Sequence, residues 1–421
     1  MNQTSSAGRM PEIRVPGMLT LGGLIAGLIL GLALGDTAVL PPLLAIAEPL
    51  GAFWLKALKM TILPLVIGLL FTGIIETAAA AHAGAMARRT LGLIVGVLAA
   101  SAVVGGLLMP VLLALFPAPE IAMPQGTAAP GSALPGLGDF LGSLLPTNVF
   151  TAAADDAMLP VIVFVALFAT AATRLAEEPR RQLSLLFEGL AGAMIVVIGW
   201  VLAVAPLGVF ALGLTLAASS GAAAIGALAH YIVLVASLGA LFLLGAYPLA
   251  MTVGRKGLGA FARAILPAQV VAISTQSSLA SLPAMLASCR KLDVETTTSE
   301  FVLPLAVTLF RATGPAMNVG VAIYAAQLAG HELTPMAIAA GVLVAFVTTF
   351  GTVSLPGTVS FIASTGPIAA AMGVPLWPLG ILVAVEMLPD IMRTVGNVTM
   401  DVAVTSAVDT GAQETSTETL H

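Results

Sequence analysis

The stretch "EMLPDIMRTVGNVTMD", residues 386–401, places four charged side chains and an asparagine inside long apolar sequence. On a helix of about 3.6 residues per turn, the strongly polar side chains fall within roughly one quarter of the circumference. The opposite side carries apolar residues such as Ile391, Val395 and Val398. The segment is therefore predicted to be a helix with one wet or protein-facing side. The polar residues on that side are Glu386, Asp390, Arg393, Asn397 and Asp401.

A charged side chain at the centre of a bilayer costs about 2.5–3.5 kcal/mol on insertion scales, so several charges on one helix need partners. One interpretation is structural, with Asp390 or Glu386 paired to Arg393 to hold helices together. The other is functional, with the charges completed by a substrate and by ions. We favour the functional interpretation, because ionisable residues inside a membrane mark transport pathways by default.

The composition excludes a water-soluble globule. The 421 residues are 58% hydrophobic and 9% charged, whereas an ordinary soluble protein carries about 25% charged residues. Apolar runs such as 21–35 and 231–251 do not alternate with polar residues, which excludes an outer-membrane barrel. We expect a polytopic α-helical membrane protein. Its single cysteine, Cys289, cannot form an intrachain disulfide and is predicted to be a small buried thiol.

Apolar length predicts the clear membrane spans, since crossing a bilayer takes about 20 residues. Clusters of Lys and Arg recur at one set of span ends, and the positive-inside rule makes those ends cytoplasmic. The segments expected outside carry almost none, and Lys56 and Lys59 are exceptions that can snorkel to the interface. We predict a multi-pass protein of the plasma (inner) membrane with a cytoplasmic N-terminus. The predicted spans are 17–36, 50–77, 90–116, 157–175, 184–216 and 224–251.

Two later segments, 268–291 and 343–364, have apolar arms and a polar centre rich in Ser, Thr, Gly and Pro. Each arm is too short to span, and irregular backbone survives at membrane depth only inside protein or beside a wet cavity. We predict two helical hairpins that enter and leave on the same side, related as an inverted repeat. Two kinked spanning helices are the alternative. Paired interrupted segments indicate the binding site of a secondary transporter.

The polar side of 386–401 has a chemistry that suits an amino acid with an extra acidic group. Arg393 offers a planar fork for a carboxylate, and Asp390, one turn earlier, can hold an ammonium group. Pro389 weakens the local helix bonding and frees backbone carbonyls nearby.

Five motifs, in order along the chain, resemble those of the glutamate/aspartate transporters, the dicarboxylate/amino acid:cation symporter family. They are "LKMTILPLVIGLLFTGI" (58–74), "LLPTNVF" (144–150), "APLGVFAL" (205–212), "STQSSLASLP" (274–283) and "DIMRTVGNVTMD" (390–401). The resemblance covers residues 17–408. It implies an all-α polytopic fold with eight transmembrane helices and two re-entrant helical hairpins. It also implies a homotrimer in which each transport domain moves like an elevator.

The resemblance also implies a division of the chain into a scaffold and a transport domain. The cytoplasmic segment would be 1–16, with scaffold helices in 17–85 and in 117–222, the latter after an extracellular loop. The transport domain would comprise 86–116 and 223–408, followed by a disordered tail at 409–421. Within 223–408, the first hairpin would cover 258–291, helix seven 297–328, the second hairpin 334–368 and helix eight 376–408.

By the resemblance, Arg393 would bind the substrate side-chain carboxylate and Asp390 its amino group, with hydrogen bonds from Thr394 and Asn397. The hairpin tips would bind the main carboxylate, and Asp401 would bind sodium. The tip residues are Gln276, Ser277, Ser278, Thr352, Ser354, Leu355, Pro356 and Gly357. The residues implied in binding or replacing a cation are Asp401, Asn397, Arg311, Thr308, Thr349 and Ser101, with Glu386 in the supporting network.

One departure from the family is large. Where the family's seventh span carries an "NMDGT" motif with sodium ligands, this chain has "FRATG", residues 310–314, so the Asp becomes Ala312 and the Met becomes Arg311. In span three, Val97 and Ala100 replace the family's Tyr and Thr, although Ser101 remains. Losing an acid and gaining an arginine raises the local charge by as much as two bound sodium ions would.

Our hypothesis is that Arg311 is a tethered cation, so that transport is sodium-independent and either proton-coupled or an exchange. The alternative is a sodium-coupled symporter of a dicarboxylate or a neutral amino acid. Gln276 replaces a family arginine and Glu386 a family aspartate, which alters the support of Arg393. The family's dicarboxylate members lack an acid at the position of Asp390, which favours an amino acid here.

Other function classes find little support. The histidines His82, His230, His331 and His421 share no motif with a nucleophile, so we do not expect an enzyme. No phosphate-binding Gly-rich loop occurs, which argues against ATP-driven transport. An anion channel is the weaker alternative. We expect no cofactor beyond sodium or a proton as coupling ion, no nucleic acid partner, and contacts with lipid and a small-molecule substrate.

Overall fold

The computed structural model describes residues 16–35, 37–81, 84–119, 141–142, 144–351 and 357–418, without the side chains of 357–359 and 411–418. This described part is helical and contains no strand. Six of its helices are long and apolar enough to cross a membrane, which agrees with the predicted polytopic membrane protein. They are α1 (Gly17–Leu34), α2 (Leu40–Ala81), α3 (Ala85–Leu115), α7 (Glu177–Ala203), α9 (Ala223–Thr252) and α10 (Leu258–Thr275).

The predicted spans 17–36, 90–116 and 224–251 correspond closely to α1, α3 and α9. The span at 50–77 is the inner part of the longer α2, and 157–175 corresponds to α6 (Met158–Ala172), which follows the short α5 (Val149–Ala154).

The single span predicted at 184–216 is wrong. The structure has two helices there, α7 and α8 (Ala205–Ser220), which meet at Val204. Pro206 lies in the first turn of α8, and it has no N–H with which to continue the ladder of α7.

Helices α1 and α8 pack through glycines. A Cβ added at Gly23, Gly27 or Gly31 would collide with backbone atoms of α8. Small residues let helix backbones approach closely in membranes, where packing replaces the hydrophobic effect as the force between helices. Trp54 joins α2 to the end of α7, because its indole N–H donates to the carbonyl of Val201 at 3.0 Å.

The second half of the chain is built from helices in pairs. The first predicted hairpin corresponds to α10 and α11 (Ser278–Lys291), which pack together and are joined by Gln276 and Ser277. The first arm, α10, has 18 residues and is longer than the sequence pattern suggested. The second predicted hairpin corresponds to α14 (Pro335–Thr349) and α15 (Gly357–Ala371), which also pack together.

Predicted helices seven and eight are each interrupted. Helix seven consists of α12 (Thr296–Leu309) and α13 (Gly314–Leu328), and helix eight of α16 (Trp377–Leu382) and α17 (Met387–Glu418). The C-terminal tail predicted to be disordered from residue 409 is instead helical as far as Glu418. An established helix gains one hydrogen bond for each residue it adds, so extending α17 needs no new nucleus.

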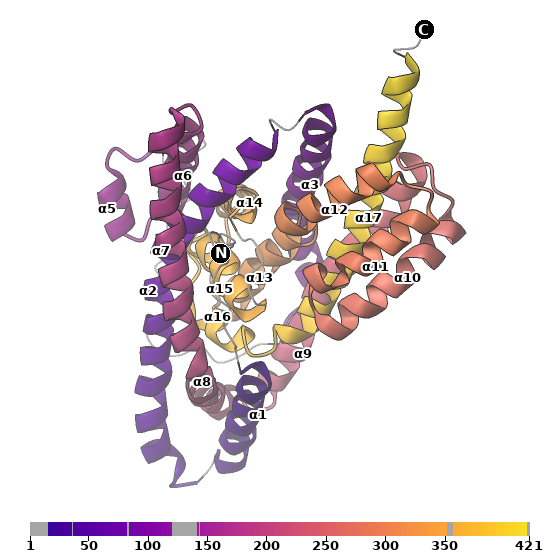
Figure 1. Ribbon diagram of the computed structural model, residues 1–421. Coiled ribbons are helices and arrows are strands. Elements are labelled where there is room, and N and C mark those ends of the chain that lie inside the picture. Colours follow the sequence, from indigo (N-terminus) through magenta and orange to yellow (C-terminus); the bar gives the residue numbers. More distant parts are fainter. Residues whose placement is uncertain are drawn as a thin grey trace, which may run out of the picture.

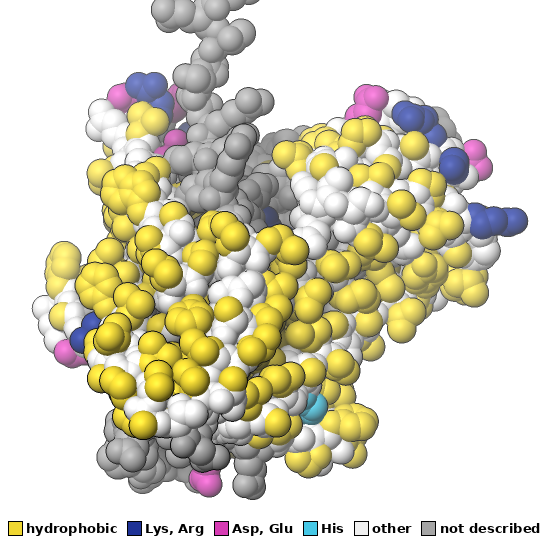
Figure 2. Space-filling model, turned by 90° about the horizontal axis from the view of Figure 1, so that it is seen from below, with side chains coloured by type: hydrophobic (Ala, Val, Ile, Leu, Met, Phe, Trp, Pro, Cys, Tyr) yellow, Lys and Arg dark blue, Asp and Glu magenta, His cyan; other side chains and the backbone are white. Residues whose placement is uncertain are grey.

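Figure 1 shows α17 running beside α9, with α10, α11 and α12 gathered around it. Helix α13 packs against α3 and α15, so it joins this group to the centre of the molecule. The face in Figure 2 is largely apolar, and charged side chains gather at its margins. Cys289 of α11 is buried among the apolar side chains of this group of helices, as predicted.

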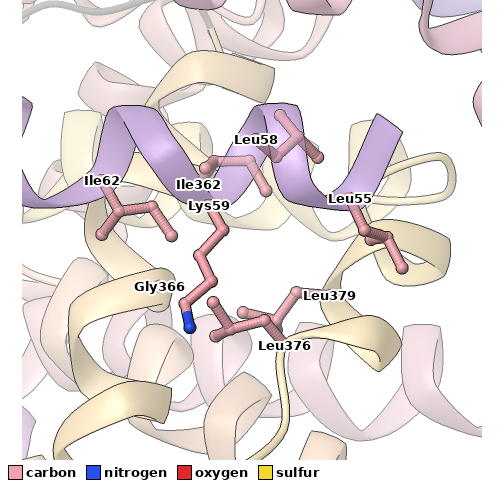
Figure 3. A pocket seen from close by; sticks show the side chains of 9 residues that line it. Leu55, Leu58, Lys59, Ile62, Ile362, Gly366, Leu376 and Leu379 are labelled. Atoms are coloured by element: carbon pink, nitrogen blue, oxygen red, sulfur yellow. The ribbon is translucent and has the colours of Figure 1, made fainter. Parts of the chain in front are cut away.

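Helix α2 meets the second half of the chain along α15. Apolar side chains from α2, with Ile362 of α15 and Leu376 and Leu379, surround a small cavity of about 20 Å³; Figure 3 shows the Lys59 side chain among them. The Lys59 ammonium contacts Asp156 at 2.6 Å. At the end of α14, Gly351 lies against the backbone of α2, and a Cβ on Gly73 would collide with the carbonyl of Phe350.

Candidate functional site

A polar cavity of about 150 Å³ lies where α17, the tip of the α10–α11 pair, the α12–α13 break and α15 come together. Eight of the residues that the sequence singled out line it, and four others complete the lining. The eight are Gln276, Ser277, Ser278, Arg311, Asp390, Arg393, Thr394 and Asn397; the others are Leu279, Val307, Phe310 and Ser360.

The predicted polar side of 386–401 is confirmed for the residues that line the cavity. Asp390, Arg393, Thr394 and Asn397 occupy successive turns of α17 and reach the same space. Glu386 does not belong to the helix; it lies in the turn before it, where its carbonyl accepts the N–H of Asp390 at 3.0 Å. Its side chain is buried behind the cavity wall.

Each of the three guanidinium nitrogens of Arg393 has a partner. Nη2 pairs with Glu386, Nε lies 3.1 Å from the carboxylate of Asp390, and Nη1 donates to Asn318 at 2.7 Å. Both pairings considered from the sequence therefore exist together, and Asn318 of α13 is an added partner. The sequence analysis did not single out Asn318, which lies among mostly apolar residues of α13.

Tyr231 of α9 contacts the cluster that Arg393 forms with Glu386, Asp390 and Asn318. Its hydroxyl donates to Glu386 at 2.7 Å, and its ring is fully buried against Tyr324 with centroids 5.4 Å apart. Tyr324 in turn donates to the carbonyl of Ala227 at 2.6 Å. The sequence analysis missed both tyrosines, because nothing in the local pattern of α9 or α13 connects them with Glu386.

The break between α12 and α13 covers residues 310–313 and was not predicted. It is held by α17, since the N–H and the hydroxyl of Thr313 both donate to the Asn397 side-chain carbonyl at 3.0 Å. The Thr313 hydroxyl also lies 3.2 Å from the carbonyl oxygen of Arg393. Discontinuous helices of this kind surround the binding sites of many transporters.

Arg311 lies within this break and faces the cavity. Its side chain is partly buried, and Nη1 lies 3.4 Å from the hydroxyl of Ser360 on α15, which is a long hydrogen bond. Among the described residues, no carboxylate lies within ion-pair distance of it. Through space, its charge is attracted by Asp390, repelled by Arg393 and attracted more weakly by Asp401.

Asp401 is fully buried two turns beyond Thr394, outside the cavity lining. Neither carboxylate oxygen has a hydrogen-bond partner among the described residues. A buried carboxylate in this state needs a proton, a cation or a nearby positive charge. The donor set is thus compatible with a cation at Asp401 and also with compensation by Arg311, which acts on it electrostatically.

The tip of the α10–α11 pair borders the cavity as predicted. Gln276 adopts a left-handed conformation with φ of 50° and ends α10, and Ser277 caps α11 by accepting the N–H of Ala280 at 3.2 Å. The tip of the other pair cannot be placed in the same way: Thr352, Ser354, Leu355 and Pro356 lie outside the described residues, and Gly357 is the first residue of α15.

Three residues proposed for a cation site do not line the cavity. The Ser101 hydroxyl accepts the N–H of Ala316 at 3.1 Å and so joins α3 to α13. The Thr308 hydroxyl is exposed and bonds to the carbonyl of Pro304 at 2.8 Å. Thr349 is buried near the end of α14, where its hydroxyl donates to Ala345 at 2.7 Å.

Comparison with known proteins relates the chain to membrane transporters. Residues 18–410 match the model of the sodium:dicarboxylate symporter family. The chain is 28% identical over 389 residues to the proton/sodium-glutamate symport protein of Bacillus subtilis (strain 168), covering 90% of this chain and 88% of the relative.

Two further relatives differ in their substrates. The proton/glutamate-aspartate symporter of Escherichia coli (strain K12) is 27% identical, with 83% of this chain and 82% of the relative covered. C4-dicarboxylate transport protein 1 of Pseudomonas aeruginosa (strain UCBPP-PA14) is 23% identical, with 89% and 83% covered. The matched proteins are symporters and transport proteins, so the chain is a secondary transporter of the membrane and not an enzyme. It belongs to the sodium:dicarboxylate symporter family.

Proposed function

We propose that the protein transports an acidic amino acid or a related carboxylate, and that it does so without sodium, by proton coupling or by exchange. The observation that carries this proposal is the position of Arg311, whose guanidinium faces the same cavity as Asp390 and Arg393. A permanent positive charge there supplies what a bound cation would otherwise supply, since arginine stays protonated in proteins.

The cavity lining supports a small carboxylate substrate. It combines two guanidinium groups with Asp390, the hydroxyls of Ser277 and Ser278, and the side chains of Thr394 and Asn397. Asp390 is the group suited to a substrate ammonium, which favours an amino acid over a plain diacid. The relatives named above as glutamate, glutamate-aspartate and C4-dicarboxylate transporters cover the same range of substrates.

We further propose the elevator architecture of eight spanning helices and two re-entrant hairpins, α10–α11 and α14–α15. Residues 17–85 and 117–222 would form the scaffold of a homotrimer, and 86–116 with 223–408 the transport domain. The surface between α2 and α15 is largely apolar, so movement along it would break few polar contacts. The protein would lie in the plasma membrane with its N-terminus in the cytoplasm.

Asp401 favours one alternative. Both of its oxygens lack a partner among the described residues, and a sodium ion could take them as ligands. A sodium-coupled symporter of a dicarboxylate or a neutral amino acid is therefore the second candidate. An anion channel is a weaker third, because no observation favours it over a carrier.

The test is uptake of labelled glutamate, aspartate, succinate and alanine into proteoliposomes, with sodium and proton gradients varied independently. We expect a carboxylate substrate to exchange across the membrane without sodium. Strong stimulation by a sodium gradient would replace the first proposal by the second. Current without saturable uptake or counterflow would identify a channel.

A matched variant tests the role of the break itself. The combination Phe310→Asn, Arg311→Met and Ala312→Asp replaces the added cation with the carboxylate that the family motif carries. We expect this variant to require sodium for any uptake it retains. Sodium-independent uptake equal to that of the wild type would show that the coupling ion does not depend on this segment.

A further inference from the structure

We propose that the groove between α3 and α14 binds one membrane phospholipid, with an acyl chain along the two helices and an ammonium-bearing headgroup at the turn between α13 and α14. The groove is separate from the polar cavity, so the inference goes beyond the proposed function. It concerns the lipid that the protein retains, and it depends neither on the substrate nor on the coupling ion.

Two cavities meet in this groove. One, of about 390 Å³, is lined by apolar residues of α3 and α14. The other, of about 510 Å³, lies against the ends of α3 and α13 and the turn that leads into α14. Ile338 of α14 lines both cavities. The groove therefore has a long apolar part and one end that includes polar side chains.

The lining follows one side of α3. It recurs at Ala99, Val103, Gly106, Pro110 and Ala114, in steps of three or four residues, as side chains on one face of a helix do. Small residues among them leave space between α3 and α14. A single helix face thus runs through both cavities and gives the groove its direction.

The two helices touch closely at the floor of the apolar part. Gly106 has no side chain, and a Cβ at this position would lie 2.4 Å from the Val342 side chain of α14. On the outer side of this contact, 47% of Val103 and 67% of Leu107 are exposed. The groove is therefore closed by protein on one side and bordered by exposed apolar side chains on the other.

The length of the apolar part matches one leaflet of a bilayer. From Ala99 to Leu107 the helix rises about 12 Å, and half of the hydrocarbon core of a bilayer is about 15 Å thick. Ala99 lies near the middle of α3, which is long and apolar enough to span the membrane. An acyl chain entering at the polar end would reach the bilayer centre at Ala99.

An acyl chain is the occupant that suits the apolar part. Water would find few hydrogen-bonding partners among these side chains. An empty groove would deprive the lining atoms of dispersion contacts. In a membrane, close packing replaces the hydrophobic effect as the force that favours association. A chain lying between the helices supplies that packing along the whole of the lined face.

The polar end favours a headgroup with an ammonium. It is lined by Gln327, His331 and Glu332, and the Glu332 side chain is exposed. Neither Lys nor Arg is among the described residues that line the two cavities. A headgroup ammonium would be attracted by Glu332, whereas a headgroup with a net negative charge would be repelled. Phosphatidylethanolamine carries the ammonium, and phosphatidylglycerol does not.

The experiment measures lipid retained by the purified full-length protein, using native mass spectrometry in detergent with added phosphatidylethanolamine or phosphatidylglycerol of identical acyl chains. Val103→Trp places a large side chain in the groove. Val111→Trp is its matched control, since Val111 lies on α3, is similarly exposed at 51% and does not line either cavity. Melting temperatures check that both variants are folded. If Val103→Trp is not, Ala339→Phe fills the groove from α14 instead.

The headgroup end is tested in the same measurement by Glu332→Gln. Glu300→Gln is its control, because Glu300 is an exposed acid on α12 outside both cavities. The wild type should retain phosphatidylethanolamine about threefold better than phosphatidylglycerol, as one exposed charge attraction gives. Glu332→Gln should abolish this preference, and Glu300→Gln should keep it.

Val103→Trp, or Ala339→Phe in its place, should lower the retention of phosphatidylethanolamine about tenfold or more, because the chain and the new ring cannot share the space. Val111→Trp should retain lipid as the wild type does. Equal retention by the groove-filling variant and Val111→Trp overturns the site. Equal retention of the two lipids by the wild type overturns the headgroup assignment. Loss of an oligomer instead of lipid in the groove-filling variant would assign the groove to a second copy of the chain and overturn the lipid.

Discussion

Residues 17–220 and 223–410 both hold polar groups in an apolar molecule, but they place their charged groups differently. In the first region, the ion pair of Lys59 with Asp156 is exposed, and buried hydroxyls such as that of Thr61 bond to carbonyls of their own helix. In the second, buried charged groups bond across helices, as Glu386 does to Tyr231 and Arg393 to Asn318. These bonds make the helices depend on one another, and the polar cavity lies beside them.

Arg393→Met should produce the largest effect, because it breaks the cross-helix cluster at its centre. Glu386 and Asp390 would lose their common partner. Removing one member of a buried ion pair costs about 3–5 kcal/mol. The measurement is thermal unfolding of the purified protein in detergent, together with carboxylate uptake, which should be lost. An unchanged melting temperature would mean that the cluster is not structural.

Tyr231→Phe weakens the same cluster from its edge. Glu386 would lose a donor while its surroundings stay buried. Loss of a hydrogen bond to a charged group costs about 1.5–3 kcal/mol. Tyr247→Phe is the matched control, since its hydroxyl accepts a bond of 3.5 Å from Gln269 at the limit of hydrogen bonding. A melting temperature clearly lower for Tyr231→Phe than for Tyr247→Phe would show that the cross-helix bond to Glu386 contributes to stability.

Gly27→Ala tests the first region, where close backbone packing replaces polar contacts. The added methyl would collide with the backbone of Phe210 and Leu214 and push α1 away from α8. Overpacking of this kind costs about 1–3 kcal/mol. Gly22→Ala on the same helix meets nothing within 4 Å, so it should be neutral or slightly stabilising. Equal melting temperatures for the two variants would contradict the packing account.

Lys59→Met should have the smallest effect. Its pair with Asp156 is short, at 2.6 Å, but both side chains are more than half exposed, at 53% and 60%. Exposed ion pairs contribute about 0.2–1 kcal/mol, far less than the pairs of Arg393. Unfolding midpoints measured at low and high salt are the readout. A loss as large as that of Arg393→Met would remove the distinction between the two regions.

The sequence predicts the helices better than it predicts their interruptions. Long apolar segments are recognisable because transfer energies add over about 20 residues. The turn at Gln276 and Ser277 was predictable from its run of polar residues, whereas the break at 310–313 was not. Phe310 and Ala312 are apolar residues that fit a continuous membrane helix, so they give no sign of a break. What holds the break is a bond from Thr313 to Asn397, far along the chain.

The candidate site likewise has residues that helix periodicity predicts and partners that only tertiary packing decides. Periodicity placed Asp390, Arg393, Thr394 and Asn397 on one side of α17, because local geometry decides that. The partners on other helices, Tyr231, Asn318 and Ser360, could not be deduced, since each depends on tertiary packing. Which arginine is already neutralised is a question of such packing, and the sequence pattern cannot answer it.

The crossing of α2 and the end of α14 has a further consequence. Gly73 and Gly351 meet there through backbone atoms, with no side chain of either inserted into the other helix. Interlocked side chains resist sliding, because each must change rotamer before its helix can advance. A contact between bare backbones has no such register. At this one crossing the two segments can part and meet again without a change of rotamer in either glycine, beside the half of the chain that carries the polar cavity.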